Sequence, residues 1–181
     1  MTSCTEVRSA FVSEDQITFQ NASQRLPFML ACLDEAFRMY PPVPTGLQRV
    51  TPPGEPTQIS GYEIPPGTKV SVHQMAAYAS PTNFYNADSY VPERWLPDVT
   101  NDANSPYHGD RRDVLQPFSV GPRNCISRNL AYNEMRLILA RVLWNLDMIL
   151  CEESKWWNNQ QTYTLWEKPS LFCRLKDRHV T

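Results

Sequence analysis

The first clear pattern in the chain is a helical repeat of apolar residues in segment 25–40. The apolar positions of this repeat are Leu26, Leu30, Leu33 and Phe37. Pro27 stands where the first turn of a helix tolerates proline, and Pro41 and Pro42 follow where a helix must end. The pattern therefore predicts a helix over residues 25–40.

The residues after this helix carry short β-prone runs without a helical period. Between residues 47 and 73 these runs are interrupted by Pro-Pro-Gly, by Ser-Gly and by a second Pro-Pro-Gly, which predicts a small antiparallel sheet. Residues 79–124 mix aromatic residues with Pro, Asn and Asp and show no sustained period, which predicts a long loop. Because loops beyond about 15 residues are uncommon in compact domains, we expect this one to be functional or wrapped over another part of the molecule.

A second helical stripe and a terminal hairpin complete the predicted fold. The apolar stripe of segment 125–145 is formed by Ala131, Met135, Ile138 and Val142. The stretches LDMILCEE and SLFCRLKD lie within residues 146–178 and predict two paired strands. The expected fold class is mainly α with small antiparallel β-sheets, or α+β.

Composition narrows the function classes. The 181 residues are 41% hydrophobic and 20% charged, with a net charge of -2, so the chain is a globular protein without the electrostatic footprint of a nucleic-acid-binding protein. It shows neither a secretory signal nor an apolar run long enough to span a membrane. Its 5 cysteines include no CxxC pair, which disfavours a zinc ribbon or a disulfide framework.

Glu35 and Arg38 lie three residues apart on the first predicted helix, so they share a face and can form an ion pair. For such a spacing alone, an exposed surface pair is the ordinary interpretation. Here the helix is apolar on most sides, which predicts that the charges are buried. Buried charges require partners, so we expect a third charge from elsewhere in the chain.

A single cysteine, Cys125, stands where the loop FSVGPRNCISR meets the second predicted helix. Backbone amides at such a junction stabilise a thiolate, which can act as a nucleophile, a redox sensor or an iron ligand. A buried cysteine without a function is the ordinary alternative. Iron ligation suits the surroundings best, because Gly121 permits close backbone approach and Arg123 offers a cation to an anionic group.

Three motifs in order resemble the cytochrome P450 family. They are ExxR at Glu35–Arg38, PERW at Pro92–Trp95 and FxxGxRxC at Phe118–Cys125. Together they are similar to the C-terminal third of such an enzyme, which implies a partial and incomplete domain. The segments VHQMAAYASP and SYVPERWLP are similar to those of fungal members that act in secondary metabolism.

The resemblance assigns roles to residues. It implies that Cys125 is the thiolate ligand of haem iron, that Gly121 and Arg123 contact the cofactor, and that Phe118 packs beside the thiolate. Arg49 is assigned to the haem propionates, although an exposed strand arginine remains the alternative.

The same resemblance implies that Arg94 of the PERW segment is the third charge of a structural network with Glu35 and Arg38. It also implies a substrate pocket lined by Val43, Pro44, Thr45, Leu165 and Trp166, whose character suggests a small apolar organic substrate.

The implied reaction is insertion of one oxygen atom from dioxygen into that substrate. An NADPH–cytochrome P450 reductase is the implied electron donor, and the endoplasmic reticulum membrane is the implied location of the full-length parent.

Two departures from the family pattern argue against activity of the isolated chain. Ser127 replaces the glycine that the family places beside the porphyrin, and a side chain there opposes tight seating of the ring. No segment resembles the long central helix that delivers protons for oxygen activation. We therefore expect the isolated chain to bind haem poorly and to be inactive. The alternative is a non-catalytic remnant or interaction module that starts at Met1.

Overall fold

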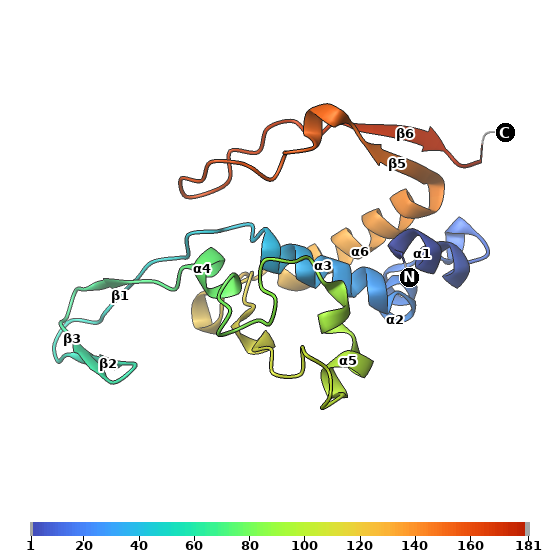
Figure 1. Ribbon diagram of the computed structural model, residues 1–181. Coiled ribbons are helices and arrows are strands. Elements are labelled where there is room, and N and C mark those ends of the chain that lie inside the picture. The colour runs from blue at the N-terminus through green and yellow to red at the C-terminus, as the bar shows by residue number, and fades with distance from the viewer. Residues whose placement is uncertain (1, 180–181) are drawn as a thin grey trace.

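The computed structural model describes residues 2–179, and its core is formed where four helices meet (Figure 1). These helices are α1 (Ser3–Ala10), α2 (Phe19–Arg25), α3 (Pro27–Met39) and α6 (Arg128–Asn145). The largest cluster of buried apolar residues joins them: Val7, Phe11, Ile17, Ala22, Leu26, Met29, Ala140, Leu143 and Trp144. Helices from the two ends of the chain therefore share one core.

The predicted helix 25–40 corresponds to α3, which is two residues shorter at its start and one residue shorter at its end. Leu26 has φ -124° and ψ 57°, so α2 ends at Arg25 and α3 begins at Pro27. The reason is that the ring of a proline disfavours the helical conformation in the residue before it. The Glu6 carboxylate of α1 accepts from the backbone N–H groups of Phe28 at 2.7 Å and Met29 at 2.8 Å, and so caps α3.

Two nested ladders replace the single small sheet predicted over residues 47–73. Strand β1 (Arg49–Val50) pairs antiparallel with β4 (Lys69–Val70), and β2 (Thr57–Ile59) pairs antiparallel with β3 (Tyr62–Ile64). The prolines and glycines between them prevent the ladders from merging, since proline cannot donate to a ladder. This arm extends away from the helices (Figure 1) and leads into α4 (Gln74–Tyr78).

The predicted loop 79–124 follows an irregular path through short helical turns. It contains α5 (Pro97–Asn101) and 3₁₀ turns at Pro92–Trp95, Arg112–Val114 and Gly121–Arg123. Phe84 is completely buried within it. This segment therefore packs against the helices and wraps over α3.

The second predicted helix begins three residues later than expected. Cys125 belongs to a turn in which its N–H donates to the Phe118 carbonyl at 2.9 Å, and α6 starts at Arg128. The closing bond of this turn, together with the positive φ of Gly121, holds the chain out of helical geometry until then. At the other end, β5 (Leu146–Leu150) pairs antiparallel with β6 (Cys173–Asp177).

These elements confirm the predicted α+β class, mainly helical with small antiparallel ladders. Within residues 2–179, none of the helices has the length and apolar character needed to cross a bilayer.

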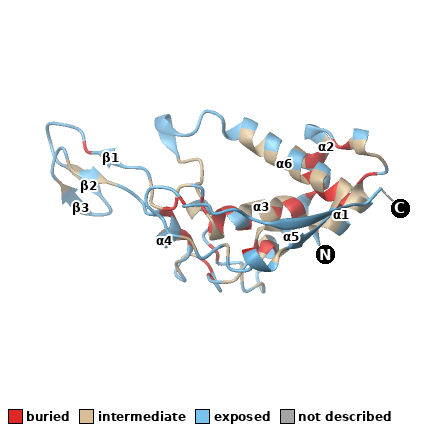
Figure 2. Ribbon diagram, turned by 90° about the horizontal axis from the view of Figure 1, so that it is seen from above, coloured by how far each residue is buried: buried red, intermediate tan, exposed pale blue. Residues whose placement is uncertain are grey.

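The surface of the chain is larger than that of a complete domain. The accessible area is 12096 Å² at a mass of 20.9 kDa, whereas a folded monomer of this mass exposes about 9,000 Å². Figure 2 shows where part of the excess lies, because the first turn of α6 is exposed, whereas buried residues occur only near its other end, at Ala140, Leu143 and Trp144. Ile126 is 99% exposed, and Ile149 of β5 is 67% exposed. The fold is therefore partial.

Candidate functional site

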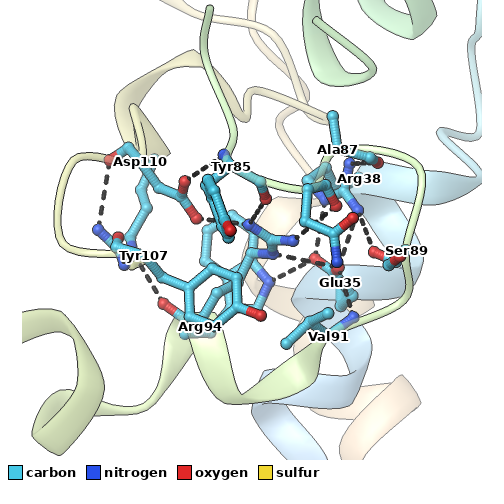
Figure 3. Close-up of polar contacts among 12 residues, drawn as sticks. Glu35, Arg38, Tyr85, Ala87, Ser89, Val91, Arg94, Tyr107 and Asp110 are labelled. Atoms are coloured by element: carbon cyan, nitrogen blue, oxygen red, sulfur yellow. Dashed lines mark hydrogen bonds and ion pairs between the residues drawn. The ribbon is translucent and has the colours of Figure 1, made fainter. Parts of the chain in front are cut away.

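The carboxylate of Glu35 lies at the centre of a buried network of charges (Figure 3). Its Oε1 atom accepts from Arg38 Nη2 at 2.8 Å, from Arg94 Nε at 3.2 Å and from the Val91 N–H at 2.8 Å. Its Oε2 atom accepts from Arg38 Nε at 2.9 Å and from Trp95 Nε1 at 2.9 Å. The helix and the PERW segment are thus joined at one side chain.

Arg38 extends this network to the backbone of the loop that follows α4. Its Nη1 atom donates to the carbonyls of Tyr78 at 3.0 Å and Ala87 at 2.6 Å, and its Nη2 atom donates to the Ser89 carbonyl at 2.9 Å. The guanidinium also lies over the Phe84 ring, 5.3 Å from its centroid. Every one of these partners comes from residues 78–89, so Arg38 fixes the path of that segment over α3.

Arg94 meets a second carboxylate on its other side. Its Nη1 atom donates to Asp110 Oδ2 at 2.5 Å and to the Tyr85 carbonyl at 2.9 Å. Asp110 Oδ1 in turn accepts from the Tyr85 N–H at 2.7 Å. Arg112 lies beside this group and contacts its backbone only. It donates to the Arg94 carbonyl at 2.9 Å and to the Tyr107 carbonyl at 2.6 Å.

Asp110 explains how the predicted network can be buried at all. The sequence predicted one carboxylate and two guanidiniums, which leave one positive charge without a partner. Asp110 supplies the second negative charge, and its side chain is as inaccessible as that of Arg94. Sequence reasoning missed Asp110 and Trp95 as members of the network, and the only signal for Trp95 was its place inside the PERW motif.

The environment of Glu35 keeps its carboxyl ionised. Burial by itself would raise the pKa, but hydrogen bonds from Arg38, Val91 and Trp95 outweigh it and hold the pKa of Glu35 below its usual 4.5. The network is therefore an ionised structure near neutral pH.

The turn that carries Cys125 lies at the surface, beside α3 and α6. Cys125 is exposed and has a free thiol. Phe118 anchors the turn, because its ring contacts Phe37 of α3 at 5.6 Å and Tyr132 of α6 at 5.2 Å between centroids. The aromatic cluster fixes the turn to both helices while its cysteine stays accessible.

Two predicted cationic residues border this turn. Arg49 of β1 donates to Ser119 Oγ at 3.3 Å, which brings the strand arm to the segment before the cysteine. Arg123 lies within the turn and is exposed. Ser127 is also exposed, and its side chain makes no capping hydrogen bond to α6. Ser127 therefore has no capping role at the start of α6.

The two segments predicted to line a substrate pocket meet in the structure. Thr45 Oγ1 donates to the Thr164 carbonyl at 3.3 Å, and Trp166 Nε1 donates to the Pro41 carbonyl at 2.7 Å. Trp166 is buried and stacks on Tyr40 with 4.4 Å between ring centroids, so it anchors the terminal loop. Two neighbouring positions are buried or half-buried, Pro44 and Val43, whereas Leu165 is 55% exposed.

The family model and the similar curated proteins all point to one family. The family model described as Cytochrome P450 matches residues 4–174. A trichothecene C-4 hydroxylase of Trichoderma arundinaceum is 61% identical over 176 residues, which are 97% of this chain and 35% of that protein. The cytochrome P450 monooxygenase olcB of Penicillium canescens is 57% identical over 96% of this chain and 35% of its own length. The monooxygenase dtxS2 of Metarhizium robertsii is 55% identical, again over 96% of this chain. The chain thus spans about a third of the length of these curated relatives.

Proposed function

The chain belongs to the cytochrome P450 family, and we propose that it is the haem-ligating part of a haem-thiolate monooxygenase that acts on a small apolar organic substrate. The observation that carries this proposal is the position of Cys125. Its free thiol is exposed on a turn anchored to the two helices that the buried network and the aromatic cluster hold in place.

Apart from Ser127, whose side chain stands where the family has glycine, the residues around this turn fit a haem group chemically. A thiolate is a ligand for haem iron, and Arg49 and Arg123 are cations suited to the two propionates. Gly121 has φ +77°, and a Cβ built on it would meet no atom within 4 Å, so the backbone there is open to a flat ring. In our proposal Cys125 ligates the iron, Phe118 packs beside its sulfur, and the arginines hold the propionates.

Bound haem with a thiolate ligand would supply dioxygen activation. The chain's own residues contribute position and electrostatics. Glu35, Arg38, Arg94 and Asp110 hold the segment 78–112 on α3, and this fixes the start of the cysteine turn. The N–H of Cys125 is bonded to the Phe118 carbonyl, which fixes the backbone of the ligand residue without any cofactor.

Substrate, partner and location are proposed for the whole parent protein. The hydrogen bond between Thr45 and Thr164 brings the two proposed pocket segments together, and the names of the fungal relatives support a substrate from secondary metabolism. We propose NADPH–cytochrome P450 reductase as the electron donor and the endoplasmic reticulum membrane as the site of the parent.

The test is haem ligation in a longer chain that restores the preceding two-thirds. The reduced protein with carbon monoxide should show the absorption band typical of thiolate-ligated haem. Cys125→Ala should abolish that band. Cys173→Ala is the matched control, because Cys173 is also exposed but lies on β6, and it should leave the band unchanged. Equal loss in both variants would refute the assignment of the ligand.

A second candidate function concerns the 181 residues acting alone. The exposed apolar side chains, with Ile126 at 99% and Ile149 at 67%, favour an interaction module without oxygenase activity, because a binding partner would cover them. Sequencing the transcript upstream of the Met1 codon separates the two functions. An in-frame segment encoding the rest of the family fold supports the enzyme, and an in-frame stop codon supports the module. Turnover with reductase and NADPH by the isolated chain would contradict the module.

A further inference from the structure

Helix α3 carries a second polar surface on the side turned toward the start of α6. A cavity of about 570 Å³ lies there between the two helices. Its polar lining consists of Asp34 from α3 and five residues from α6: Arg128, Asn129, Tyr132, Asn133 and Arg136. None of the cavity's lining residues belongs to the network around Glu35, and Tyr132 alone links it to the aromatic cluster of the cysteine turn, through Phe118.

Arg136 borders this cavity, its guanidinium lies over the Tyr132 ring, 5.1 Å from the centroid, and one of its donors has no hydrogen-bond partner. Arg136 Nη1 donates to Ser23 Oγ of α2 at 2.7 Å, which fixes the guanidinium in place. Its Nε atom is buried and has no hydrogen-bond partner among the described residues. A buried unpaired donor is costly, so a shift of the Arg136 side chain that gives Nε an acceptor from a ligand is favourable.

The balance of charge and hydrogen-bonding groups indicates the class of ligand. Two guanidiniums, two carboxamides and one phenol offer donors, while Asp34 is the single carboxylate in the lining. Metal cations are disfavoured by the two positive charges. Arginine pairs with tetrahedral oxyanions through two parallel N–H bonds. We propose that the α3–α6 cavity binds a small oxyanion of the phosphate or sulfate class, held by Arg128 and Arg136 and released when Asp34 is ionised.

The ionised carboxylate of Asp34 repels the bound oxyanion, because it lines the same cavity. The groups that act on it are Arg136, Arg128 and Tyr132, all from α6. Burial raises the pKa of Asp34 to about 6, and the two arginines only partly oppose this rise. An oxyanion beside the carboxyl favours its neutral form further. Binding is therefore coupled to proton uptake and strengthens as the pH falls through about 6.

Sulfate is the probe for this site, because it stays a dianion across the pH range of the test. The intact chain is titrated with sodium sulfate at constant ionic strength, at about pH 5 and about pH 8, and the dissociation constant is taken from the rise in melting temperature. We expect saturable binding that is about tenfold tighter at the lower pH, as one charge removed beside the anion requires. Inorganic phosphate and glycerol phosphate, added in parallel, distinguish a free anion from a phosphate ester.

Three variants separate this site from general salt effects. Asp34→Asn should bind sulfate at pH 8 as tightly as the parent does at pH 5, and its affinity should not change with pH. Arg136→Gln should weaken binding at least tenfold, with Arg128→Gln as the second variant if the first fails to fold by circular dichroism. Arg174→Gln, an exposed arginine on β6, should behave as the parent.

Two further results would overturn the proposal. One is a sulfate response of Arg136→Gln equal to that of Arg174→Gln, and the other is a pH dependence that persists in Asp34→Asn. Absence of saturable binding at both pH values would refute it equally.

Discussion

Asp34 and Glu35 are neighbours in the sequence, yet the two faces of α3 on which they lie give them opposite properties. Burial acts on both carboxyl groups in the same direction, toward a higher pKa. Glu35 accepts five hydrogen bonds from Arg38, Arg94, Val91 and Trp95, and its pKa falls below 4.5. Asp34 has two arginines near it that interact through space, and its pKa rises to about 6.

The difference shows that direct donors, rather than nearby charge alone, decide whether a buried carboxyl stays ionised. One face of the helix is saturated by the chain's own residues and serves as a rigid support. The face that carries Asp34 borders a cavity, across which Arg136 of α6 has a buried donor without a hydrogen-bond partner. Substitutions on the two faces should therefore change stability in opposite directions.

The largest effect should follow the removal of the saturated carboxylate. Glu35→Ala strands the guanidiniums of Arg38 and Arg94 in a buried site, at a cost of roughly 3–5 kcal/mol in the free energy of unfolding. Urea denaturation followed by tryptophan fluorescence measures this cost. Glu93→Ala is the control from the same region, because Glu93 is exposed, and its effect should stay within about 0.5 kcal/mol. Equal effects would show that Glu35 is not the centre of the network.

A smaller loss should follow the neutralisation of the second carboxylate. Asp110→Asn keeps the shape of the side chain but weakens its charged bond to Arg94, which costs about 1.5–3 kcal/mol. A double-mutant cycle with Arg94→Met gives the coupling energy between the two positions. Asp113→Asn is the matched control, because Asp113 pairs with Arg111 only at the surface. A coupling energy near zero would contradict the role of Asp110.

The smallest effect should be a gain in stability when Asp34, on the face that borders the cavity, is neutralised. The pKa of Asp34 is higher in the folded chain than the unfolded value of 3.8, so its ionisation opposes folding as the pH rises through about 6. Asp34→Asn should therefore stabilise the protein by about 1–2 kcal/mol at pH 8, after allowance for solvent screening.

The sign of this gain can be checked along the pH scale. The advantage of Asp34→Asn should vanish below about pH 4, where the parent carboxyl is protonated in both states. Over the same acidic range, the stability supplied by Glu35 is lost, because its folded pKa lies below 4.5. Asp98→Asn, at an exposed position, should show neither trend. A loss of stability in Asp34→Asn at pH 8 would reverse the comparison.

The sequence could predict those elements that have a strong local signal. The apolar spacing and the two prolines after Tyr40 were enough for α3, and alternating runs were enough to place β5 and β6 near each other. Helices α1 and α2 were not predicted, because their 8 and 7 residues are too few to show a clear helical period. Their threonine caps, Thr2 and Thr18, were the available signal.

The site was predictable only as far as its motifs reached. Glu35, Arg38 and Arg94 stand in recognisable motifs, and the structure brings their side chains together. Asp110 lies in a segment without periodicity, and nothing local in the sequence shows that its carboxylate forms an ion pair with Arg94. The late start of α6 depends on the hydrogen bond between Cys125 and Phe118, which is a feature of tertiary geometry.

The wide separation of Glu35 and Asp110 along the chain has a consequence for the order of events during synthesis. Asp110 leaves the ribosome 75 residues after Glu35. At about 5–20 residues per second, α3 waits about 4–15 seconds with its charges still hydrated before the neutralising carboxylate exists. Closing so long a loop is also entropically costly. The final packing of α3 against segment 78–112 is therefore a late step of folding, and a nascent chain that pauses before Asp110 exposes this helix to chaperones and proteases.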